Sequence, residues 1–304
     1  MGMLQISNDT VALSVDLAGG AIHRFDRHAA SGPVPVFHRG AVEADVCFPL
    51  IPFGNRLRGN AFVFDGGTHR LQPNTASDPH YIHGDAWLGH WRTIAHDHHE
   101  LTIAYDHAGK DGPYAYRAEQ RFALSDNMLS VSLSVTNRAR RRLPYGLGLH
   151  PFLPMTPATI VDFTAERYWE QDAAFLPLKS HPARGGMDFS GGRRLPGTWM
   201  NTEFEGWNGA ATIMWPETGS RLRIEADAQF SRCMIFVSDT AFDALYRHDW
   251  FCFEPMTHSV DAHHRADLGG LVALEPDETL AGSCRFIVEC HAPAPRQAKR
   301  WRSS

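Results

Sequence analysis

The 304-residue sequence has no long apolar run, no leader in which basic residues precede apolar ones, and no excess of positive charge. No apolar stretch approaches the roughly 20 residues that cross a bilayer, so we expect no membrane association. The opening residues 1–9 do not have the order of a secretory signal, which predicts a cytoplasmic location. A formal net charge of -5 provides no positive field for a phosphate backbone, so a nucleic-acid partner is not expected.

Cysteine is scarce and follows no metal or redox spacing. The odd number of cysteines and the absence of a CxxC pair argue against a disulfide framework. Several of them lie in apolar, strand-like stretches, so we expect buried free thiols. The five cysteines are Cys47, Cys233, Cys252, Cys284 and Cys290.

Helical periodicity is also missing. No segment has a sustained apolar stripe at i, i+3, i+4 and i+7 between helix caps. Apolar and polar residues instead alternate, most strictly in residues 11–17 and 129–136, and Gly, Pro, Asn and Asp separate the alternating stretches. The sequence therefore predicts an all-β fold.

The chain also has no Pro-, Ser- or Gly-rich linker between its blocks of predicted strands, and no internal repeat. With 43% apolar and 21% charged residues it has ordinary globular composition. We therefore expect a single domain over residues 1–290. Residues 291–304 are basic, interrupted by proline and nearly free of large apolar side chains, which predicts a flexible tail.

Histidine, in contrast, is abundant, with 18 residues. The two clusters that suggest a metal site lie in polar surroundings typical of surface turns, and surface histidines need no metal to explain them. We expect no metal, although a metal-dependent β-sandwich enzyme remains an alternative. The clusters are His96, His98 and His99, and His258, His263 and His264.

Residues 250–257 form the most apolar strand-like stretch, and Glu254 stands where proline follows. The pattern predicts a strand that is buried on both faces and that ends at Glu254. A buried carboxylate is costly unless it has hydrogen-bond partners or a raised pKa. Glu254 therefore has either a structural partner or a chemical task, and this stretch alone does not decide between them.

Three further places carry polar residues that chemistry can use. The turn 53–59 contains Arg56, whose planar guanidinium can bind ligand oxygens in pairs. His83 lies beside glycine, and Pro151 holds His150 extended, after glycines that would let a ligand approach the backbone. A lone histidine on an apolar strand is usually a core residue. Two histidines with Glu254 and Arg56 form a set that can transfer protons. Tryptophans suited to stacking on a sugar lie at 87, 91, 199, 207, 215 and 250.

The order of these motifs resembles that of the aldose 1-epimerases, also called galactose mutarotases. The resemblance spans residues 19–289, most of the chain. It is carried by Asn55-Arg56, Gly59-x-x-Phe62, Gly66, Leu71-x-x-Asn74, His83-Gly84, Trp91, His150-Pro151-Phe152, Phe204-x-Gly206-Trp207-x-Gly209, Glu254-Pro255-Met256-Thr257 and Asp261-Ala262.

The resemblance implies a large antiparallel β-sandwich, the galactose mutarotase-like supersandwich, whose cleft binds a monosaccharide and interconverts its α and β anomers without a cofactor. By that similarity Glu254 would be the general base toward the C1 hydroxyl, and His150 the general acid toward the ring oxygen. The two groups would act on opposite sides of one acetal centre. His83 would hold the ring or C1 oxygen, and Arg56 with its neighbour Asn55 would bind sugar hydroxyls.

The sequence departs from the family pattern at two positions. Asn201 stands where many members have an Asp that binds sugar hydroxyls, and an amide donates as well as accepts. Asp85 replaces the second glycine of the commoner His-Gly-Gly, and we expect it to be an extra substrate-binding acceptor beside the cleft. These departures leave the identity of the sugar open.

Two other functions remain open. A hexose-6-phosphate 1-epimerase is one, because Arg56 and Arg58 could pair with a phosphate. A non-catalytic carbohydrate-binding protein of the same fold is the other, because fold does not fix function. We expect Arg58 to be solvated or paired with a carboxylate, free galactose or glucose to be the substrate, and the protein to be a monomer or homodimer.

Overall fold

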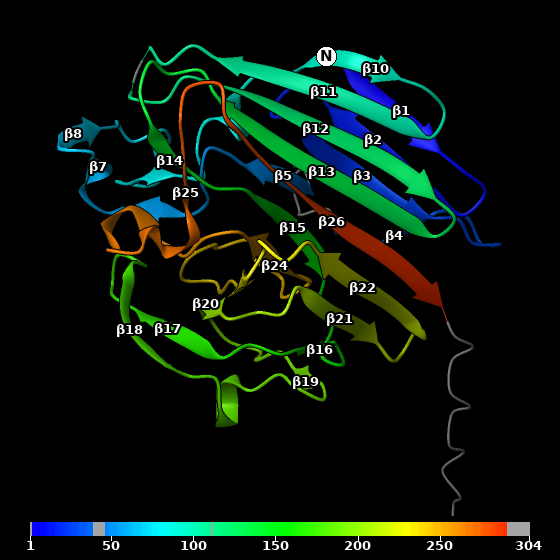
Figure 1. Cartoon of the computed structure of the whole chain (residues 1–304). Coiled ribbons are helices and arrows are strands. Elements are labelled where there is room, and N and C mark those ends of the chain that lie inside the picture. Colours follow the sequence, from blue (N-terminus) through cyan, green and yellow to red (C-terminus); the bar gives the residue numbers. More distant parts are fainter. Residues whose placement is uncertain (1, 39–45, 111, 291–304) are drawn as a thin grey trace, which may run out of the picture.

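The computed structural model describes residues 2–38, 46–110 and 112–290, and strands dominate these residues (Figure 1). The all-β prediction is confirmed. Within the described ranges, no helix combines the length and the apolar character of a membrane span. The predicted tail, residues 291–304, lies outside the described residues, and the division into one domain and a tail stays a prediction.

The first large sheet has eleven strands joined by antiparallel ladders. Its strands are β1 (Met3–Ser7), β2 (Val11–Asp16), β3 (Ala21–Arg27), β4 (Val34–Pro35), β5 (Cys47–Leu50), β15 (Gly148–Pro154), β17 (Arg167–Gln171), β18 (Pro177–Pro182), β20 (Met200–Glu205), β23 (Arg232–Val237) and β24 (Trp250–Met256). Their order in space is β1-β2-β3-β5-β15-β24-β23-β20-β17-β18, with β4 paired to β3. Strands far apart in the sequence therefore meet at the centre of this sheet.

The second large sheet has nine strands, also antiparallel. Its strands are β10 (Arg92–His96), β11 (Glu100–His107), β12 (Tyr116–Ser125), β13 (Met128–Asn137), β16 (Ile160–Phe163), β19 (Arg193–Arg194), β21 (Ala210–Trp215), β22 (Ser220–Ala226) and β26 (Thr279–Cys290). Their order is β10-β11-β12-β13-β26-β22-β21-β16-β19.

Three two-stranded sheets and five short 3-10 helices complete the described chain. The small sheets are β6 (Arg56–Leu57) with β9 (Tyr81–Ile82), β7 (Ala61–Phe64) with β8 (Gly67–Arg70), and β14 (Leu143–Tyr145) with β25 (Val272–Leu274). The helices are η1 (Arg58–Asn60), η2 (Ala86–Leu88), η3 (Gly185–Met187), η4 (Ala262–His264) and η5 (Leu268–Gly270).

The two large sheets pack face to face around the main hydrophobic core (Figure 1). Phe163 of the second sheet packs edge-on against Phe253 of the first, with ring centroids 5.4 Å apart. Phe37 meets Phe286 in the same way at 5.1 Å. None of the five cysteines forms a disulfide in the described part of the chain, and all but the exposed Cys290 are buried, as the sequence predicted.

Strand β24 lies near the middle of the first sheet, between β15 and β23. Its residues after Trp250 are all buried, as predicted for a strand covered on both faces. The expectation that the strand ends at Glu254 is wrong, because Pro255 pairs with Cys233 and Met256 with Arg232. Glu254 is therefore an interior residue of a central strand, where the backbone is held on both sides.

Candidate active site

The register of the central strands places the candidate acid and base side by side. Strand β15 pairs with β24 so that Gly148 faces Met256 and Phe152 faces Cys252, which puts His150 opposite Glu254. Directly paired residues in a sheet point to the same face. His150 and Glu254 therefore project together from one face of the sheet, although 104 residues separate them in the sequence.

The row continues across the neighbouring strands. Phe48 of β5 pairs with His150, and its ring stacks on the imidazole with centroids 4.5 Å apart. Beyond Glu254 the row continues through Met234 to Glu203. The order of the strands thus creates a row of cross-strand neighbours, and the candidate site occupies its Phe48, His150 and Glu254 end.

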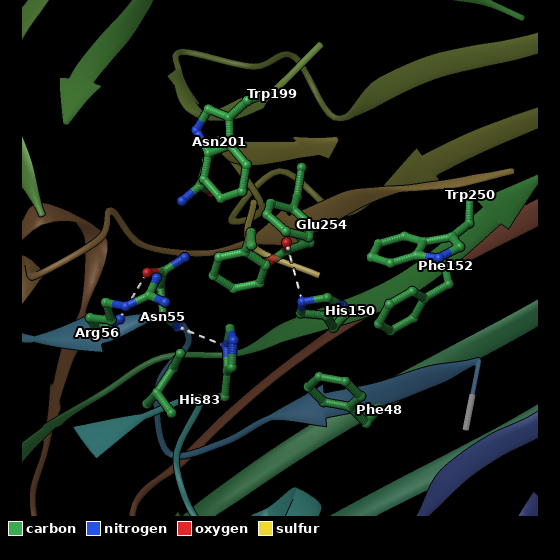
Figure 2. Close-up of a pocket in the computed structure, with 13 residues that line it drawn as sticks. Phe48, Asn55, Arg56, His83, His150, Phe152, Trp199, Asn201, Trp250 and Glu254 are labelled. Carbon is green, nitrogen blue, oxygen red and sulfur yellow. Dashed lines mark hydrogen bonds and ion pairs between the residues drawn. The ribbon is translucent and has the colours of Figure 1, made fainter. Parts of the chain in front are cut away.

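Phe48, His150 and Glu254 of this row line a cavity of about 260 Å³, just below the usual size of ligand pockets (roughly 300–1,000 Å³). Figure 2 shows aromatic side chains at one end and Asn55, Arg56 and His83 at the other, with Glu254 and His150 between them. The cavity is lined by Phe48, Asn55, Arg56, Ile82, His83, His150, Phe152, Trp199, Asn201, Phe236, Phe242, Trp250 and Glu254. Its size and mixed lining suit one sugar ring.

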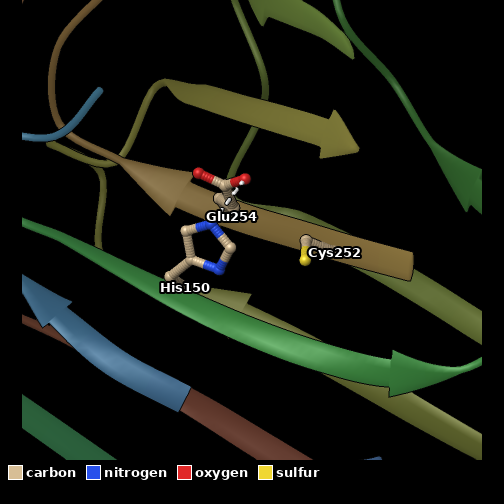
Figure 3. Close-up of side chains that lie close together, drawn as sticks. All are labelled: His150, Cys252 and Glu254. Carbon is tan, nitrogen blue, oxygen red and sulfur yellow. Dashed lines mark ion pairs between the residues drawn. The ribbon is translucent and has the colours of Figure 1, made fainter. Parts of the chain in front are cut away.

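His150 and Glu254 are in direct contact, with Nε2 of the imidazole 3.3 Å from Oε1 of the carboxyl group. They lie beside one another rather than on opposite sides of a central space, which corrects the arrangement inferred from the sequence (Figure 3). Burial raises the pKa of Glu254 to about 8, which the charge of Arg56 partly opposes, and burial lowers the pKa of His150 to about 4.

Both pKa shifts have the same physical cause, because a dry environment disfavours each charged form. Near neutral pH the pair therefore holds one proton between two groups, and burial places it on the carboxyl group. Moving that proton along the 3.3 Å contact creates a carboxylate and an imidazolium without any exchange with solvent. Oε2 of Glu254 is buried and has no hydrogen-bond partner among the described residues, so it can accept a bond from a ligand.

His83 faces the pair from a turn. The backbone N–H of Asn55 donates to Nδ1 of His83 at 3.1 Å, which leaves the ring proton on Nε2. Burial, His150 and Arg56 hold the pKa of His83 well below its usual value, so the ring is a neutral donor. Gly84 permits the turn: its φ is 70°, and an added Cβ would lie 2.0 Å from the carbonyl oxygen of Ile51.

Arg56 is fixed from several sides. Its Nε donates to Asp78 at 2.7 Å, its backbone N–H donates to Oδ1 of Asn55, and its guanidinium lies 4.9 Å from the centre of the Phe175 ring. Asn55 itself has a φ of 59°, in the left-handed region. A planar, fully charged donor held in this way presents its remaining N–H groups in one fixed direction.

His258 holds the backbone just before Asn55 and Arg56. Its Nδ1 donates to the carbonyl of Ser259, and its Nε2 accepts from the backbone N–H of Gly54 at 2.9 Å. His263 is likewise buried, with Nε2 2.8 Å from the hydroxyl of Tyr114. The expectation that these histidines lie in surface turns is therefore wrong: both are buried and bound by protein groups.

The glycines before His150 serve packing rather than ligand approach. A Cβ on Gly146 would lie 2.0 Å from the His258 ring, and a Cβ on Gly148 would lie 2.9 Å from Leu50. The sequence interpretation of these glycines as openings for a ligand is therefore wrong. They let the sheet and the His258 ring approach closely.

The structure brings six of the seven predicted site residues to one cavity: Arg56, His83, Asn201, Asn55, Glu254 and His150. Asp85 is the exception, because it lines a separate cavity, where Tyr81 donates to its carboxylate and His107 lies 3.5 Å away. The expectation that Asp85 adds an acceptor to the cleft is therefore not met. Arg58 pairs with Asp261 and Asp172, as expected.

A metal is a separate question, because His150, Cys252 and Glu254 offer three donor atoms within 4.8 Å of one another (Figure 3). Thiolate is the form of cysteine that binds metals. Burial and the charges of Glu254 and Cys47 raise the pKa of Cys252 well above its usual value, so the thiol stays protonated. The protonated thiol adds no charge to the site, whereas His150 and Glu254 are in contact and can exchange a proton.

Several residues of the site carried no signal in the sequence. Phe48, Phe236 and Phe242 were indistinguishable from core aromatics, and Asp78 from a turn residue. The order of the strands in space brings Phe48 and Phe236 to the cavity, and loops bring Phe242 to it and Asp78 to Arg56. Of the predicted tryptophans, Trp199 and Trp250 line the cavity. Those buried elsewhere in the core are Trp91, Trp207 and Trp215.

Comparison with known proteins identifies relatives over nearly the whole chain. The sequence model of a family described as aldose 1-epimerase matches residues 3–286. An uncharacterized protein of Escherichia coli (strain K12), YphB, is 39% identical over 292 residues, covering 95% of this chain and 99% of that protein. A crystal structure from Escherichia coli K12, named provisionally as an aldose 1-epimerase, has a TM-score of 0.90 and 38% identity, covering 95% of this chain and 99% of that one.

A more distant structure shares the fold. A galactose mutarotase-like protein from Clostridium acetobutylicum superposes with a TM-score of 0.82 at 17% identity, and the match covers 95% of each chain. At that identity the likeness concerns the β-sandwich alone. It agrees with the predicted fold class, which is confirmed.

Proposed function

The chain belongs to the aldose 1-epimerase family, and from that premise we propose that it is an isomerase that interconverts the α and β anomers of an unphosphorylated aldose. The observation that carries the proposal is the contact between His150 and Glu254 inside a sugar-sized cavity. Anomer exchange needs one base and one acid at the same acetal carbon, and this pair supplies both.

Ring opening uses the pair in its charged form. Glu254 removes the proton of the C1 hydroxyl while Nε2 of His150 gives its proton to the ring oxygen. The bond between C1 and the ring oxygen breaks, and the C1 oxygen becomes the carbonyl oxygen of the open-chain aldehyde. The two oxygens on C1 are neighbours, so a pair in contact can serve both from one side.

Ring closure reverses these roles after rotation about the C1–C2 bond. The hydroxyl that was the ring oxygen adds to the other face of the aldehyde and gives its proton to His150. Glu254 returns its proton to the C1 oxygen. The pair ends with the proton it began with, so no cofactor takes part, and both groups are ready for the next cycle.

The other polar residues would hold the sugar. Neutral His83 donates from Nε2, Arg56 donates from its fixed guanidinium, and the amides of Asn55 and Asn201 can donate or accept. Hydroxyl groups match this set of mostly neutral groups. The stacked rings at the other end of the cavity, such as Trp250, suit the apolar face of a sugar.

The hexose-6-phosphate alternative is less well supported. Arg56 is paired with Asp78 at 2.7 Å, and Arg58, paired with Asp261 and Asp172, is not among the residues that line the cavity. A phosphate usually collects several free cationic groups. The non-catalytic alternative leaves a costly buried carboxyl and imidazole in contact without a task.

The test is one-dimensional exchange NMR of anomeric protons for glucose, galactose and glucose 6-phosphate, with and without the protein. We expect faster exchange for at least one unphosphorylated aldose. Sugar binding without faster exchange would support the non-catalytic alternative instead. A preference of about 100-fold for the phosphate that shrinks with added salt would establish a charge-reading site.

A further inference from the structure

We propose that a second cavity beyond Arg56 and His83 is a subsite for another sugar unit, so that the preferred substrate is a reducing disaccharide or longer oligosaccharide. This inference rests on the proposed function, because it places the reducing unit at His150 and Glu254. The second cavity measures about 430 Å³, larger than the first at about 260 Å³.

The two cavities adjoin. They share the lining residues Arg56, Ile82, His83 and Phe242. Figure 2 places Arg56 and His83 at the end of the catalytic cavity away from Phe152 and Trp250. A sugar whose C1 lies at the catalytic pair therefore has a neighbouring space on the Arg56 side, into which a glycosyl substituent can extend.

The walls of the second cavity suit a sugar ring. Trp87 and Phe175 provide aromatic surfaces, and Thr75 and Ser77 provide hydroxyl groups. Trp87 also stacks on Phe48 at 5.3 Å, and Phe48 stacks on His150. An aromatic series thus runs from the catalytic imidazole into the second cavity, and aromatic faces with nearby hydroxyls are typical of carbohydrate contacts.

Phe175 adopts a backbone conformation that has a cost. Its φ is 62°, in the left-handed region, where a bulky side chain is a true outlier. The conformation places the ring under the Arg56 guanidinium and against the rings of Trp199 and Phe242. Strain of this kind persists where the surroundings enforce it, and here it shapes the wall between the two cavities.

Charge selects the class of ligand. Among the described residues that line the second cavity, Arg56 is the only Arg or Lys, and its partner Asp78 lines the same space. An anionic substituent such as a phosphate ester would meet Asp78 without an unpaired cation in return. A neutral, hydroxylated substituent meets donors and acceptors at no such cost, which favours a second sugar over a phosphate.

The experiment compares kcat/KM for anomer exchange of glucose and galactose with that of disaccharides carrying each sugar at the reducing end, in 1→4 and 1→6 linkage. We expect at least one linkage to exceed its parent monosaccharide by about tenfold. A panel in which every disaccharide is no better than its parent overturns the subsite and leaves the proposed function intact. Failure of all sugars overturns the proposed function itself.

A variant tests the location. Ala174 is an exposed turn residue that lines the second cavity and not the first. Ala174→Trp should lower kcat/KM for the best disaccharide about tenfold and leave its parent monosaccharide within about twofold. Ala30→Trp is the matched control, because Ala30 is also an exposed turn residue and lines neither cavity. Equal losses for both sugars in Ala174→Trp would contradict the proposal.

Discussion

Two central strand pairs differ in burial and in the side chains on their outward faces: β13 and β26 of the second sheet, and β15 and β24 of the first. In β13 every second residue is buried, and the residues between them are half-buried. In β24 all residues after Trp250 are buried. The outward face of the first pair carries small hydroxyl residues, and the corresponding face of the second carries His150 and Glu254.

The difference is one of surroundings. The hydroxyl groups of Ser132 and Ser283 lie 2.9 Å apart across β13 and β26, in a half-buried position where water can replace their hydrogen bond. Glu254 and His150 pair across β24 and β15 in a buried position, and this burial raises the pKa of Glu254 and lowers the pKa of His150, so that both neutral forms are favoured. The same antiparallel pairing thus gives a half-buried hydroxyl ladder in one sheet and a buried carboxyl–imidazole pair in the other.

The largest effect is expected from Glu254→Gln. Loss of the base should lower kcat/KM by at least ~100-fold. Burial raises the folded-state pKa of Glu254 to about 8, above the ordinary value of 4.5, so the native state binds more protons between these values and stability falls as pH rises. At pH 9 the Glu254→Gln variant should therefore have a higher free energy of unfolding than the native protein. The gain is up to about 1.4 kcal/mol for each pKa unit by which the carboxyl group differs between the folded and unfolded states.

Glu203→Gln is the matched control for this variant. Glu203 lies in the same cross-strand row and is fully buried, and burial raises its pKa to about 7, but it does not line the cavity. It should show the gain in stability at alkaline pH without the loss of rate. Urea unfolding at pH 5 and pH 9 with anomer exchange NMR checks both. Near-normal exchange in folded Glu254→Gln would refute the assigned base.

The second effect concerns pH. The pair holds one proton between about pH 4 and about pH 8, so kcat/KM should be level in that window and fall on either side. His150→Asn should lose about 100-fold in rate. Its residual activity needs ionised Glu254 and should therefore rise, not fall, through the alkaline range. A variant with the same alkaline decline as the native protein would show that another group is the acid.

A smaller effect is expected at the edge of the site. Asp78→Asn removes the charge that pairs with Arg56 at 2.7 Å and leaves the guanidinium uncompensated. The ratio of kcat/KM for glucose 6-phosphate to that for glucose should rise several-fold and should shrink with added salt. Lys179→Asn, at an exposed position of β18, is a charge-changing control. An unchanged ratio would show that Asp78 does not set the charge of the site.

The comparison of these two strand pairs also shows which parts of the fold and the site the sequence could predict. Alternation in residues 129–136 has a local cause, burial of one face, and it predicted β13 correctly. The position of Glu254 in a buried strand was also visible, but its neighbour Phe48 and the row to Glu203 depend on strand order, which has no local signature. The prediction for Asp85 failed for a related reason. The turn directs its carboxylate toward Tyr81 and His107, and residue spacing does not reveal the direction of a side chain.

The smallest effect is expected in the second sheet, from Ser132→Ala combined with Ser283→Ala. A cross-strand hydroxyl pair of this kind contributes roughly 0.2–1 kcal/mol. Removing both partners leaves no unsatisfied buried group, so the double variant should lose less than about 1 kcal/mol of unfolding free energy. Anomer exchange should be unchanged, because the pair lies outside the cavity. Urea unfolding of the two single variants and the double variant gives the coupling energy. A coupling well above about 1 kcal/mol, or a change in rate, would show that the outward face of this sheet is not the inert ladder that its alternation indicates.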